Sequence, residues 1–472
     1  MLHFHNTKKH LFLDHNAIAH MRFHFIAIGG SVMHNLALAL HQMGHQVSGS
    51  DDEIYEPAKS RLSAKGILPS YSGWNPDAIT PELDAVILGM HAKLDNPELK
   101  RAETLGVKVY SFPDFIYQQS QNKQRVVVAG SHGKTTITSM ILHVLKHCGR
   151  KFDYLVGAQI EGFDTMVQIT DDAPVLIVEG DEYLTSPTDR RPKFMAYHAH
   201  IAVISGIAWD HMNVFPTEAD YNRQFELLVQ SLPKAGVLIY QEEDKTLRQI
   251  VKRHARDEEH YLHPYSTPDF KIVDNQFELR LKGKKSLVSV IGRHNLANIA
   301  AAWEVCRELA VDIDDFMRHI ATFKGAAKRL EKIYDDGKNV VFRDFAHAPS
   351  KVKATVEAVK ELYGKQNVVA VLELHTFSSL NKAFLHQYHR SLRPIKNKLV
   401  FVNQHTLDTK GYPAISKQEL IQAFDDPSLE YATTAEQLQA WVKAQRQTSG
   451  NVFLFMSSGP FADLDLKNLA IG

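Results

Sequence analysis

RVVVAGSHGKTT at residues 125–136 runs directly into ITSMILHVLKHC at 137–148. A short apolar run, a glycine-containing turn and a longer run with apolar residues at helical spacing are typical of a buried strand, a tight loop and a helix. Such a loop presents backbone N–H groups at a helix N-terminus, where the partial positive charge favours phosphate. The stretch therefore predicts a parallel α/β domain that binds a nucleotide, with Lys134 at the β- and γ-phosphates and the Thr135 hydroxyl on Mg²⁺. An ordinary turn is the alternative, because Gly130 and Gly133 are closer together than the glycines of the standard P-loop.

Two further buried-type strands end in polar residues. VLIVEGDEY at 175–183 ends in a carboxylate cluster that includes Glu179, and HIAVISGIAWDH at 200–211 ends in His211. Side chains at the carboxyl ends of parallel strands face the crevice where ligands bind. We therefore expect a Mg²⁺ ligand from the cluster and place His211 in the same crevice. A solvated loop and a structural histidine are the alternatives.

Polar residues also mark the start of a long helix and of the next α/β unit. In GRHNLANIAAA (292–302), Asn295 and Asn298 share one helix face, where their amides could grip a base edge or cap the helix. In KRLE (328–331) and RDFAHAP (343–349), Arg329 could meet a triphosphate and Asp344 a ribose hydroxyl. Both could equally form ordinary salt bridges between domains.

Near the N-terminus, AIGGS at 27–31 opens a helix and GSD at 49–51 follows a second strand. A diphosphate suits the first position and an acid on a ribose suits the second. The full dinucleotide fingerprint is missing, since GGSVMHNLA has neither G-x-G nor the third glycine. Ordinary NAD binding is therefore not expected.

Length and composition indicate a multidomain, non-membrane protein. The 472 residues correspond to roughly three domains. Equal numbers of basic and acidic residues, 54 each, argue against a protein that coats nucleic acid or acidic membrane. Two cysteines, no membrane-spanning apolar run and no signal-like N-terminus predict a cytoplasmic location. Residues 1–20, which hold five of the 26 histidines, are expected to be a disordered or dispensable extension, with a metal-binding tail as the alternative.

In this order the motifs resemble those of the Mur ligases, the ATP-dependent amide-forming enzymes of peptidoglycan synthesis. The family pattern GTxGKTT, acidic cluster, DH, GxHNxxN, RxE and DxAHxP is matched here by GSHGKTT, EGDEY, WDH, GRHNLAN, KRLE and RDFAHAP. The resemblance implies three α/β domains: a Rossmann-like UDP-sugar domain at 21–120, a central P-loop ATPase domain at 121–327 and a Rossmann-like C-terminal domain for the amine substrate at 328–472. It also implies ATP and Mg²⁺ as cofactors.

The resemblance further implies roles for individual residues. ATP would be bound by Gly130, Ser131, Gly133, Lys134, Thr135, Thr136, Asn295, Arg329, Asp344 and His347. Mg²⁺ would be bound by Thr135, Glu179 and His211, and catalysis would use His132, Lys134, Glu179 and His211, with His132 facing the reacting carboxylate. The UDP part would be held by Gly29, Gly30, Ser31 and Asp51.

Two branches of the family come closest, and both act on UDP-N-acetylmuramate. EGDEYLTSPTDRRPKF (179–194) and MSSGPF (456–461) resemble the murein peptide ligase branch, which attaches L-Ala-γ-D-Glu-meso-diaminopimelate through an acyl phosphate. The alternatives are the branch that adds L-alanine and, more remotely, a non-catalytic nucleotide-sugar sensor. A monomer or weak oligomer without nucleic-acid or membrane partners is expected.

Three departures from the family pattern have consequences. Phe225 stands where many Mur ligases carry a carbamylated lysine, so no carbamate is expected. Ala348 replaces a residue that can form hydrogen bonds, and ELHTFSSLNKAF (373–384) departs from the commoner pattern where the far end of the amine substrate should lie.

Overall fold

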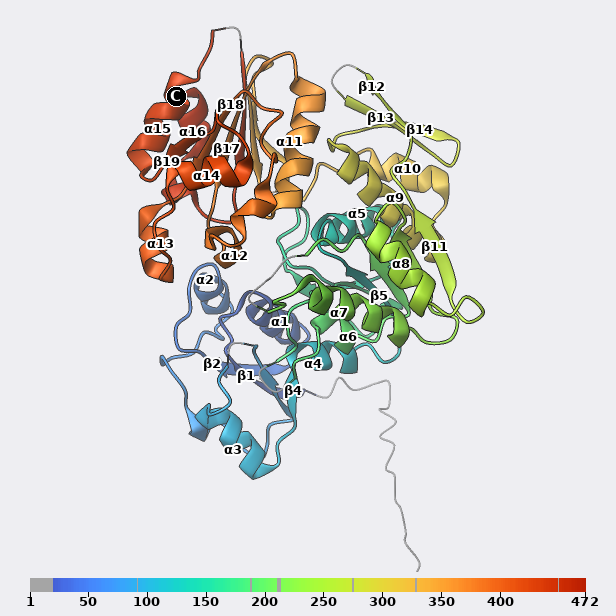
Figure 1. Cartoon of the computed structure of the whole chain (residues 1–472). Coiled ribbons are helices and arrows are strands. Elements are labelled where there is room, and N and C mark those ends of the chain that lie inside the picture. The colour runs from blue at the N-terminus through green and yellow to red at the C-terminus, as the bar shows by residue number, and fades with distance from the viewer. Residues whose placement is uncertain are drawn as a thin grey trace, which may run out of the picture. The chain divides into compact units, whose positions relative to one another are not determined.

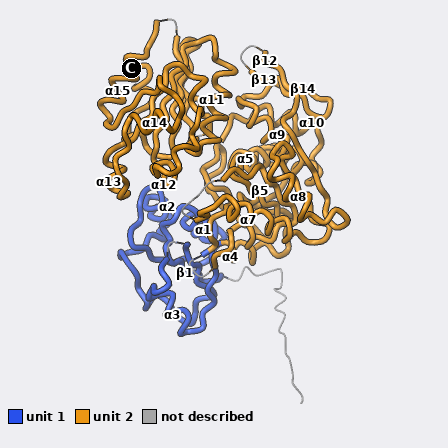
Figure 2. Tube along the Cα trace, in the orientation of Figure 1, with its two compact units in different colours: residues 1–112, 186–188 blue, residues 113–185, 189–472 orange. Residues whose placement is uncertain are grey.

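The computed structural model describes residues 20–90, 92–186, 189–209, 214–273, 276–326, 329–448 and 450–472 (Figure 1). Contacts within the chain divide it into two compact units, one of residues 1–112 with 186–188 and the other of 113–185 with 189–472 (Figure 2). His211 and all of the predicted extension except His20 lie outside the described residues.

The first unit contains a four-stranded parallel sheet in the order β2-β1-β3-β4. Its strands are β1 (Arg22–Ile26), β2 (Gln46–Ser50), β3 (Ala85–Leu88) and β4 (Val109–Ser111), and its helices are α1 (Ser31–Gln42), α2 (Ala58–Ser63), η1 (Pro76–Ala78) and α3 (Pro97–Leu105). Chain order reverses at β1, and a crevice outside the carboxyl ends of the strands is expected at such a switch point. The turn from β1 into α1 lies there.

The first part of the second unit contains a seven-stranded sheet in the order β11-β10-β9-β5-β8-β6-β7. All of its pairs are parallel except β6 with β7. Its strands are β5 (Gln124–Ala129), β6 (Asp153–Leu155), β7 (Val167–Gln168), β8 (Val175–Glu179), β9 (Ile201–Ile204), β10 (Val237–Gln241) and β11 (Tyr261–Tyr265). The central position of β5 places the loop after it at the middle of the sheet edge.

Helices of this part pack around the sheet, and α9 lies against α5 in the shared core (Figure 1). The buried alanines at 300–302 have short side chains that allow close approach. The helices are α4 (Phe112–Gln118), α5 (Lys134–His147), α6 (Lys193–Ala196), α7 (Glu218–Ser231), α8 (Lys245–His254), α9 (Arg293–Glu308) and α10 (Ile313–Ile320). A separate antiparallel sheet is formed by β12 (Phe270–Val273), β13 (Gln276–Leu281) and β14 (Lys284–Val288).

The last part of the chain forms a six-stranded sheet in the order β15-β16-β20-β17-β18-β19, parallel except for β15. Successive residues of β17 alternate between two cores, with Val369 in one and Ala370 in the other, so both faces are buried. Its strands are β15 (Glu331–Asp335), β16 (Val340–Asp344), β17 (Asn367–Glu373), β18 (Asn397–Phe401), β19 (Glu430–Ala432) and β20 (Asn451–Met456). Its helices are α11 (Pro349–Tyr363), α12 (Phe377–Leu380), η2 (Leu385–Tyr388), α13 (Gln404–Lys410), α14 (Lys417–Phe424), α15 (Ala435–Ala444), η3 (Phe461–Asp463) and α16 (Leu466–Ile471).

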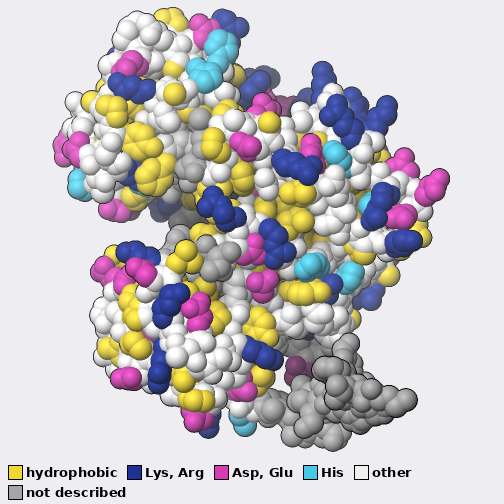
Figure 3. Space-filling view, turned by 60° about the horizontal axis from the view of Figure 1, so that its bottom comes forward, with side chains coloured by type: hydrophobic (Ala, Val, Ile, Leu, Met, Phe, Trp, Pro, Cys, Tyr) yellow, Lys and Arg dark blue, Asp and Glu magenta, His cyan; other side chains and the backbone are white. Residues whose placement is uncertain are grey.

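The predicted α/β class with parallel sheets is confirmed, whereas the predicted domain boundaries at 120 and 327 stay predictions. Within the described ranges, every helix is too short or too polar to cross a membrane. On the face shown in Figure 3, basic and acidic side chains are interspersed, as the equal numbers of the two charges suggest.

Candidate active site

The loop between β5 and α5 is shaped by two glycines that no other residue could replace without strain. Gly130 and Gly133 have φ angles of 123° and 75°, which L side chains rarely adopt. A Cβ at Gly130 would lie 2.4 Å from Ser205 Oγ, and a Cβ at Gly133 would lie 2.4 Å from Asn298 Oδ1. The loop is therefore packed between the end of β9 and α9, with its backbone close to both.

Lys134, the first residue of α5, is held by two acceptors. Its Nζ donates to Gly130 O at 2.7 Å and to Glu182 Oε2 at 2.6 Å, and the Glu182 side chain is fully buried. Burial alone would lower the pKa of Lys134, but the carboxylates of Glu182, Asp181 and Glu179 outweigh it and raise the pKa. The lysine is therefore a fixed positive charge at the base of the loop.

Thr135 and Glu179 are direct neighbours, as the prediction of a shared metal site requires. Thr135 Oγ1 donates to Glu179 Oε1 at 2.7 Å, and Gly157 N donates to Glu179 Oε2 at 2.7 Å. A hydroxyl and a carboxylate are oxygen ligands of the kind that Mg²⁺ takes, with water and substrate phosphates completing its coordination. Among the described residues no three His, Cys, Asp or Glu side chains are arranged to hold a metal ion. His211, the third predicted ligand, lies outside the described residues.

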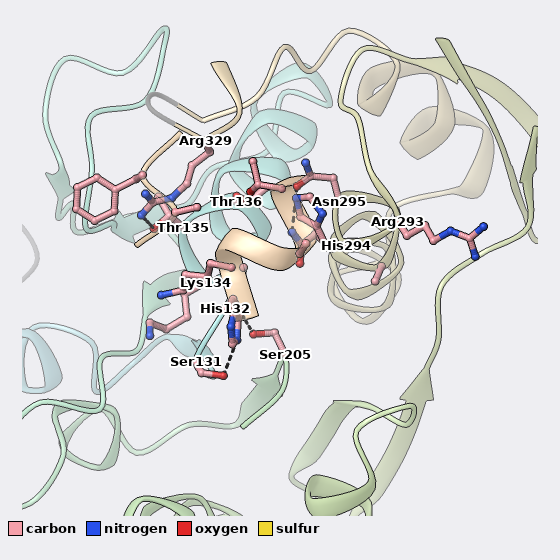
Figure 4. Close-up of a pocket in the computed structure, with 18 of the residues that line it drawn as sticks. Ser131, His132, Lys134, Thr135, Thr136, Ser205, Arg293, His294, Asn295 and Arg329 are labelled. Carbon is pink, nitrogen blue, oxygen red and sulfur yellow. Dashed lines mark hydrogen bonds between the residues drawn. The ribbon is translucent and has the colours of Figure 1, made fainter. Parts of the chain in front are cut away.

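A cavity of about 310 Å³ opens between this loop, the start of α9 and the end of β16. In Figure 4, Thr135 lies next to Arg329, and Thr136 lies next to Asn295. Of the predicted residues, the cavity is lined by Ser131, His132, Gly133, Lys134, Thr135, Thr136, Glu179, Asn295, Arg329, Asp344 and His347. A second cavity of about 500 Å³ adjoins it and shares Asn295 and Arg329.

The two asparagines do not cap α9, because its N-cap is Gly292 and no side chain caps it. Instead, Asn295 Nδ2 donates to Ile291 O at 2.8 Å, and Asn298 Nδ2 donates to Asn295 Oδ1 at 3.2 Å. These bonds fix the two amides against each other at the wall of the cavity. The base-contact interpretation is compatible with this geometry and stays a prediction.

Arg329 and Asp344 come together at the third wall of the cavity without forming a salt bridge to any described residue. The Arg329 guanidinium lies 4.7 Å from the centre of the Phe345 ring, and its Nη2 donates to Thr135 Oγ1 at 3.5 Å. Asp344 is 7% exposed and accepts from Ala346 N at 2.7 Å. Burial raises the pKa of Asp344 to about 6, although the positive charge of Arg329 opposes the shift. Both side chains therefore face the cavity.

His132 links the loop to the last α/β part of the chain. Its Nδ1 lies 2.7 Å from Ser131 Oγ, and its Nε2 lies 2.6 Å from Ser350 Oγ in the first turn of α11. His347, just before α11, has its Nδ1 2.8 Å from Phe345 O. The sequence did not predict a role for Ser350 or Phe345, because Ser350 meets His132 and Phe345 meets Arg329, and each partner comes from another element.

In the first unit, the four predicted residues meet at the turn between β1 and α1. Gly29 N donates to Asp51 Oδ2 at 2.7 Å, and Gly30 is the N-cap of α1, which begins at Ser31. Burial raises the pKa of Asp51, although the Gly29 N–H bond opposes the shift. The partial positive charge at the N-terminus of a helix favours an anion.

Three protein-family models match consecutive parts of the chain. They are described as the Mur ligase family catalytic domain (residues 22–124), the Mur ligase middle domain (128–306) and the Mur ligase glutamate ligase domain (328–459). A relative from Lactiplantibacillus plantarum, named UDP-N-acetylmuramate–L-alanine ligase, is 31% identical over 385 residues, which are 78% of this chain and 82% of that protein. The chain belongs to the Mur ligase family. Mur ligases are ATP-dependent enzymes that form amide bonds, and this Mur ligase carries GSHGKTT at residues 130–136, where the family pattern is GTxGKTT.

Other relatives of this Mur ligase bear a different name. An Escherichia coli protein named UDP-N-acetylmuramate–L-alanyl-γ-D-glutamyl-meso-2,6-diaminoheptandioate ligase is 28% identical over 361 residues, which are 75% of this chain and 79% of that protein. The crystal structure of a murein peptide ligase from Psychrobacter arcticus matches with a TM-score of 0.62 and 22% identity, over 96% of this chain and 99% of that one. The fold is therefore that of the Mur ligases, and similarity alone leaves the acceptor open between L-alanine and the tripeptide.

Proposed function

We propose that this Mur ligase joins L-Ala-γ-D-Glu-meso-diaminopimelate to the carboxyl group of UDP-N-acetylmuramate, using ATP through an acyl phosphate. The observation that carries this choice is the segment between the acidic cluster and α6. Leu184 pairs with Pro192 in an antiparallel bridge, and the segment returns to place Lys193 Nζ 3.1 Å from Asp181 Oδ2. The sequence of this segment has the pattern of the murein peptide ligase branch, and these two contacts place its ends beside the acidic cluster.

The charge of the ATP phosphates would be met by groups at the start of α5. Lys134, the N–H groups of the Gly130–Gly133 loop and Arg329 would neutralise charge on the phosphoryl oxygens as the muramyl carboxylate attacks the γ-phosphate. Thr135 and Glu179, with His211 as the further predicted ligand, would hold Mg²⁺, which when bound supplies positive charge to the same oxygens. Donors fixed before the reaction need no reorganisation during it.

The nucleoside would lie along the walls made by α9 and β16. Asn295 would contact adenine, and the ionised carboxylate of Asp344 would accept hydrogen bonds from the ribose. Thr136 and His347 would complete the ATP site. His132 would face the reacting carboxylate, and its hydrogen bond with Ser350 would fix the ring.

The remaining substrates would be bound by the first unit and the last α/β part. Gly29, Gly30, Ser31 and Asp51 would hold the UDP group through the α1 N-terminus. The acceptor amine must be neutral to attack the acyl carbon, and His211 or a carboxylate would take its proton. Phosphate then leaves as the amide bond forms.

Product analysis tests this proposal. The full chain is incubated with UDP-N-acetylmuramate, ATP, Mg²⁺ and equal concentrations of tripeptide and L-alanine, and the products are identified by mass spectrometry. The UDP-muramyl-tripeptide should dominate. Dominant formation of UDP-N-acetylmuramoyl-L-alanine would replace the proposal with the second candidate, L-alanine ligation, which the name of the Lactiplantibacillus relative favours. A Lys134→Ala variant should lose ATP-dependent ligation with either acceptor, whereas full activity in that variant would contradict the assigned role of the loop.

A further inference from the structure

Glu179, Asp181 and Glu182, the three carboxylates at the end of β8 and just after it, have different partners. Glu179 accepts from Thr135 Oγ1 and Gly157 N, and Asp181 lies 3.1 Å from Lys193 Nζ. Glu182 is the carboxylate that contacts Lys134, at 2.6 Å. The sequence assigned Glu182 no function beyond membership of the cluster, yet of the three it alone contacts the loop lysine.

Glu182 is itself held from the opposite side by a buried tyrosine. Tyr221 on α7 donates from its hydroxyl to Glu182 Oε1 at 3.2 Å, so both carboxylate oxygens are engaged. Between ring centres, Tyr221 lies 5.3 Å from Phe225 and 5.5 Å from Phe215, and Phe225 lies 5.6 Å from Phe194. These four rings, the aromatic box, are all nearly or fully buried. Close packing leaves the Tyr221 ring little freedom, and this fixes where its hydroxyl can place Glu182.

The bonds to Lys134 leave one donor for substrate. An ammonium group has three N–H donors, and Gly130 O and Glu182 Oε2 accept two of them. No other described residue bonds to Lys134, whose side chain borders the 310 Å³ cavity. The third donor is thus available to a phosphate oxygen, with a direction set by the other two bonds.

We propose that Glu182, fixed by Tyr221 and the aromatic box, is a positioning residue that aims Lys134 for phosphoryl transfer and does not contribute to the affinity for nucleotide. A carboxylate close to the phosphates opposes ground-state binding of ATP through charge repulsion. Its benefit is the orientation of the ammonium, and orientation matters most in the transition state. The inference rests on the ATP-dependent step of the proposed function and applies whichever acceptor is used.

Two variants separate orientation from affinity. Glu182→Gln keeps the shape and removes the charge, so kcat should fall about 100-fold, the order of loss that misplacing a reacting group by about 1 Å causes. A non-hydrolysable ATP analogue should bind this variant at least as tightly as the wild type. Tyr221→Phe removes only the hydroxyl, and kcat should fall about tenfold, as for the loss of one hydrogen bond to a charged group. Because Tyr221→Phe keeps the ring and its packing, the affinity of this variant for the analogue should change less than twofold. The double variant should be no slower than Glu182→Gln alone, since both changes act on the same contact.

Tyr154→Phe is the matched control. Tyr154 is 3% exposed and lies on β6, the strand that pairs with β8. Its hydroxyl donates to Thr165 O at 3.2 Å and not to a carboxylate that contacts Lys134. Its kcat should stay within twofold of the wild type. Calorimetry gives the analogue affinity, and ADP release gives kcat with whichever acceptor the wild type uses, so a wild type that rejects the tripeptide refutes the proposed acceptor and leaves this test intact.

Two outcomes would overturn the inference. Either kcat stays within threefold of the wild type in both variants, or analogue affinity falls by the same factor as kcat, which identifies a role in binding or folding. If Glu182→Gln does not fold, the split between kcat and affinity in Tyr221→Phe decides alone.

Discussion

Replacing Asp344 with asparagine should stabilise this Mur ligase at pH 8 while lowering its affinity for nucleotide. The carboxyl group is almost fully buried, and burial raises its pKa from 3.8 to about 6 against the opposing charge of Arg329. A shift of about 2 units corresponds to about 3 kcal/mol between the two protonation states. The folded protein therefore bears a cost for keeping this carboxylate ionised.

The pH dependence of this cost has a definite sign. Because the pKa of Asp344 is higher in the folded chain than in the unfolded chain, the folded state binds its proton more tightly, and stability falls as the pH rises from about 4 to about 6. Above pH 6 the whole cost is present. The asparagine variant, which has no charge to bury, should gain up to about 3 kcal/mol at pH 8 and nearly nothing at pH 4.

Thermal unfolding at pH 8, 6 and 4 checks this expectation. A gain of about 3 kcal/mol should raise the melting temperature by about 6–12 °C if the part that unfolds together has 150–250 residues. Asp336→Asn is a control of opposite sign, because backbone N–H bonds from Asn339 and Lys338 hold the pKa of Asp336 below its usual value, so its charge stabilises the folded state at pH 8. An Asp344→Asn variant no more stable than the wild type at pH 8 would refute the reasoning. Its affinity for ATP should fall, since the proposed contact with the ribose loses its charged acceptor.

Three further changes test other parts of the site. Gly133→Ala should lower the affinity for an ATP analogue at least tenfold in calorimetry, because the new Cβ would lie 2.4 Å from Asn298 Oδ1. Gly149 is the matched control position, with a comparable φ of 65° and no atom within 4 Å of an added Cβ, so Gly149→Ala should leave binding unchanged in the same assay. Removing bicarbonate should leave the rate unchanged, because buried Phe225 cannot form a carbamate; a carbamate signal from ¹³C-bicarbonate in NMR spectra would contradict this. Thr135→Val should raise the Mg²⁺ concentration for half-maximal rate about tenfold, measured by titration, since one of the proposed oxygen ligands is lost. An unchanged Mg²⁺ requirement would remove Thr135 from the metal site.

Local sequence signals predicted the parts of the site that a single element builds. The strand before Gly130 and the helix after Gly133 follow from apolar spacing, and the structure places β5 and α5 there. The parallel sheets follow from alternating strand and helix patterns. By contrast, the close packing that excludes a side chain at either glycine could be seen only in the structure, where Ser205 and Asn298 occupy the space beside the loop.

Contacts between elements that are far apart in the chain could not be predicted from local sequence patterns. His132 and Ser350 are separated by 218 positions, and no periodic pattern within either segment encodes their meeting. The capping alternative for Asn295 depended on the residue at which α9 begins, and helix ends are the least certain feature of a sequence pattern. Its rejection needed the position of Gly292 as N-cap. Likewise, the salt-bridge alternative for Arg329 could be rejected only from the structure, which places its guanidinium over the Phe345 ring.

The acidic cluster shows how neighbouring residues of one type acquire separate tasks. Charge alone makes Glu179, Asp181 and Glu182 equivalent, and the zero net charge of the chain gives no reason to distinguish them. Their differences come from the groups that the fold brings to each. A hydroxyl and a backbone N–H leave Glu179 suited to a metal, whereas buried Glu182 has the loop lysine on one oxygen and a tyrosine hydroxyl on the other. A buried charge is tolerated only with such partners, so each partner set also restricts what its carboxylate can do in the reaction.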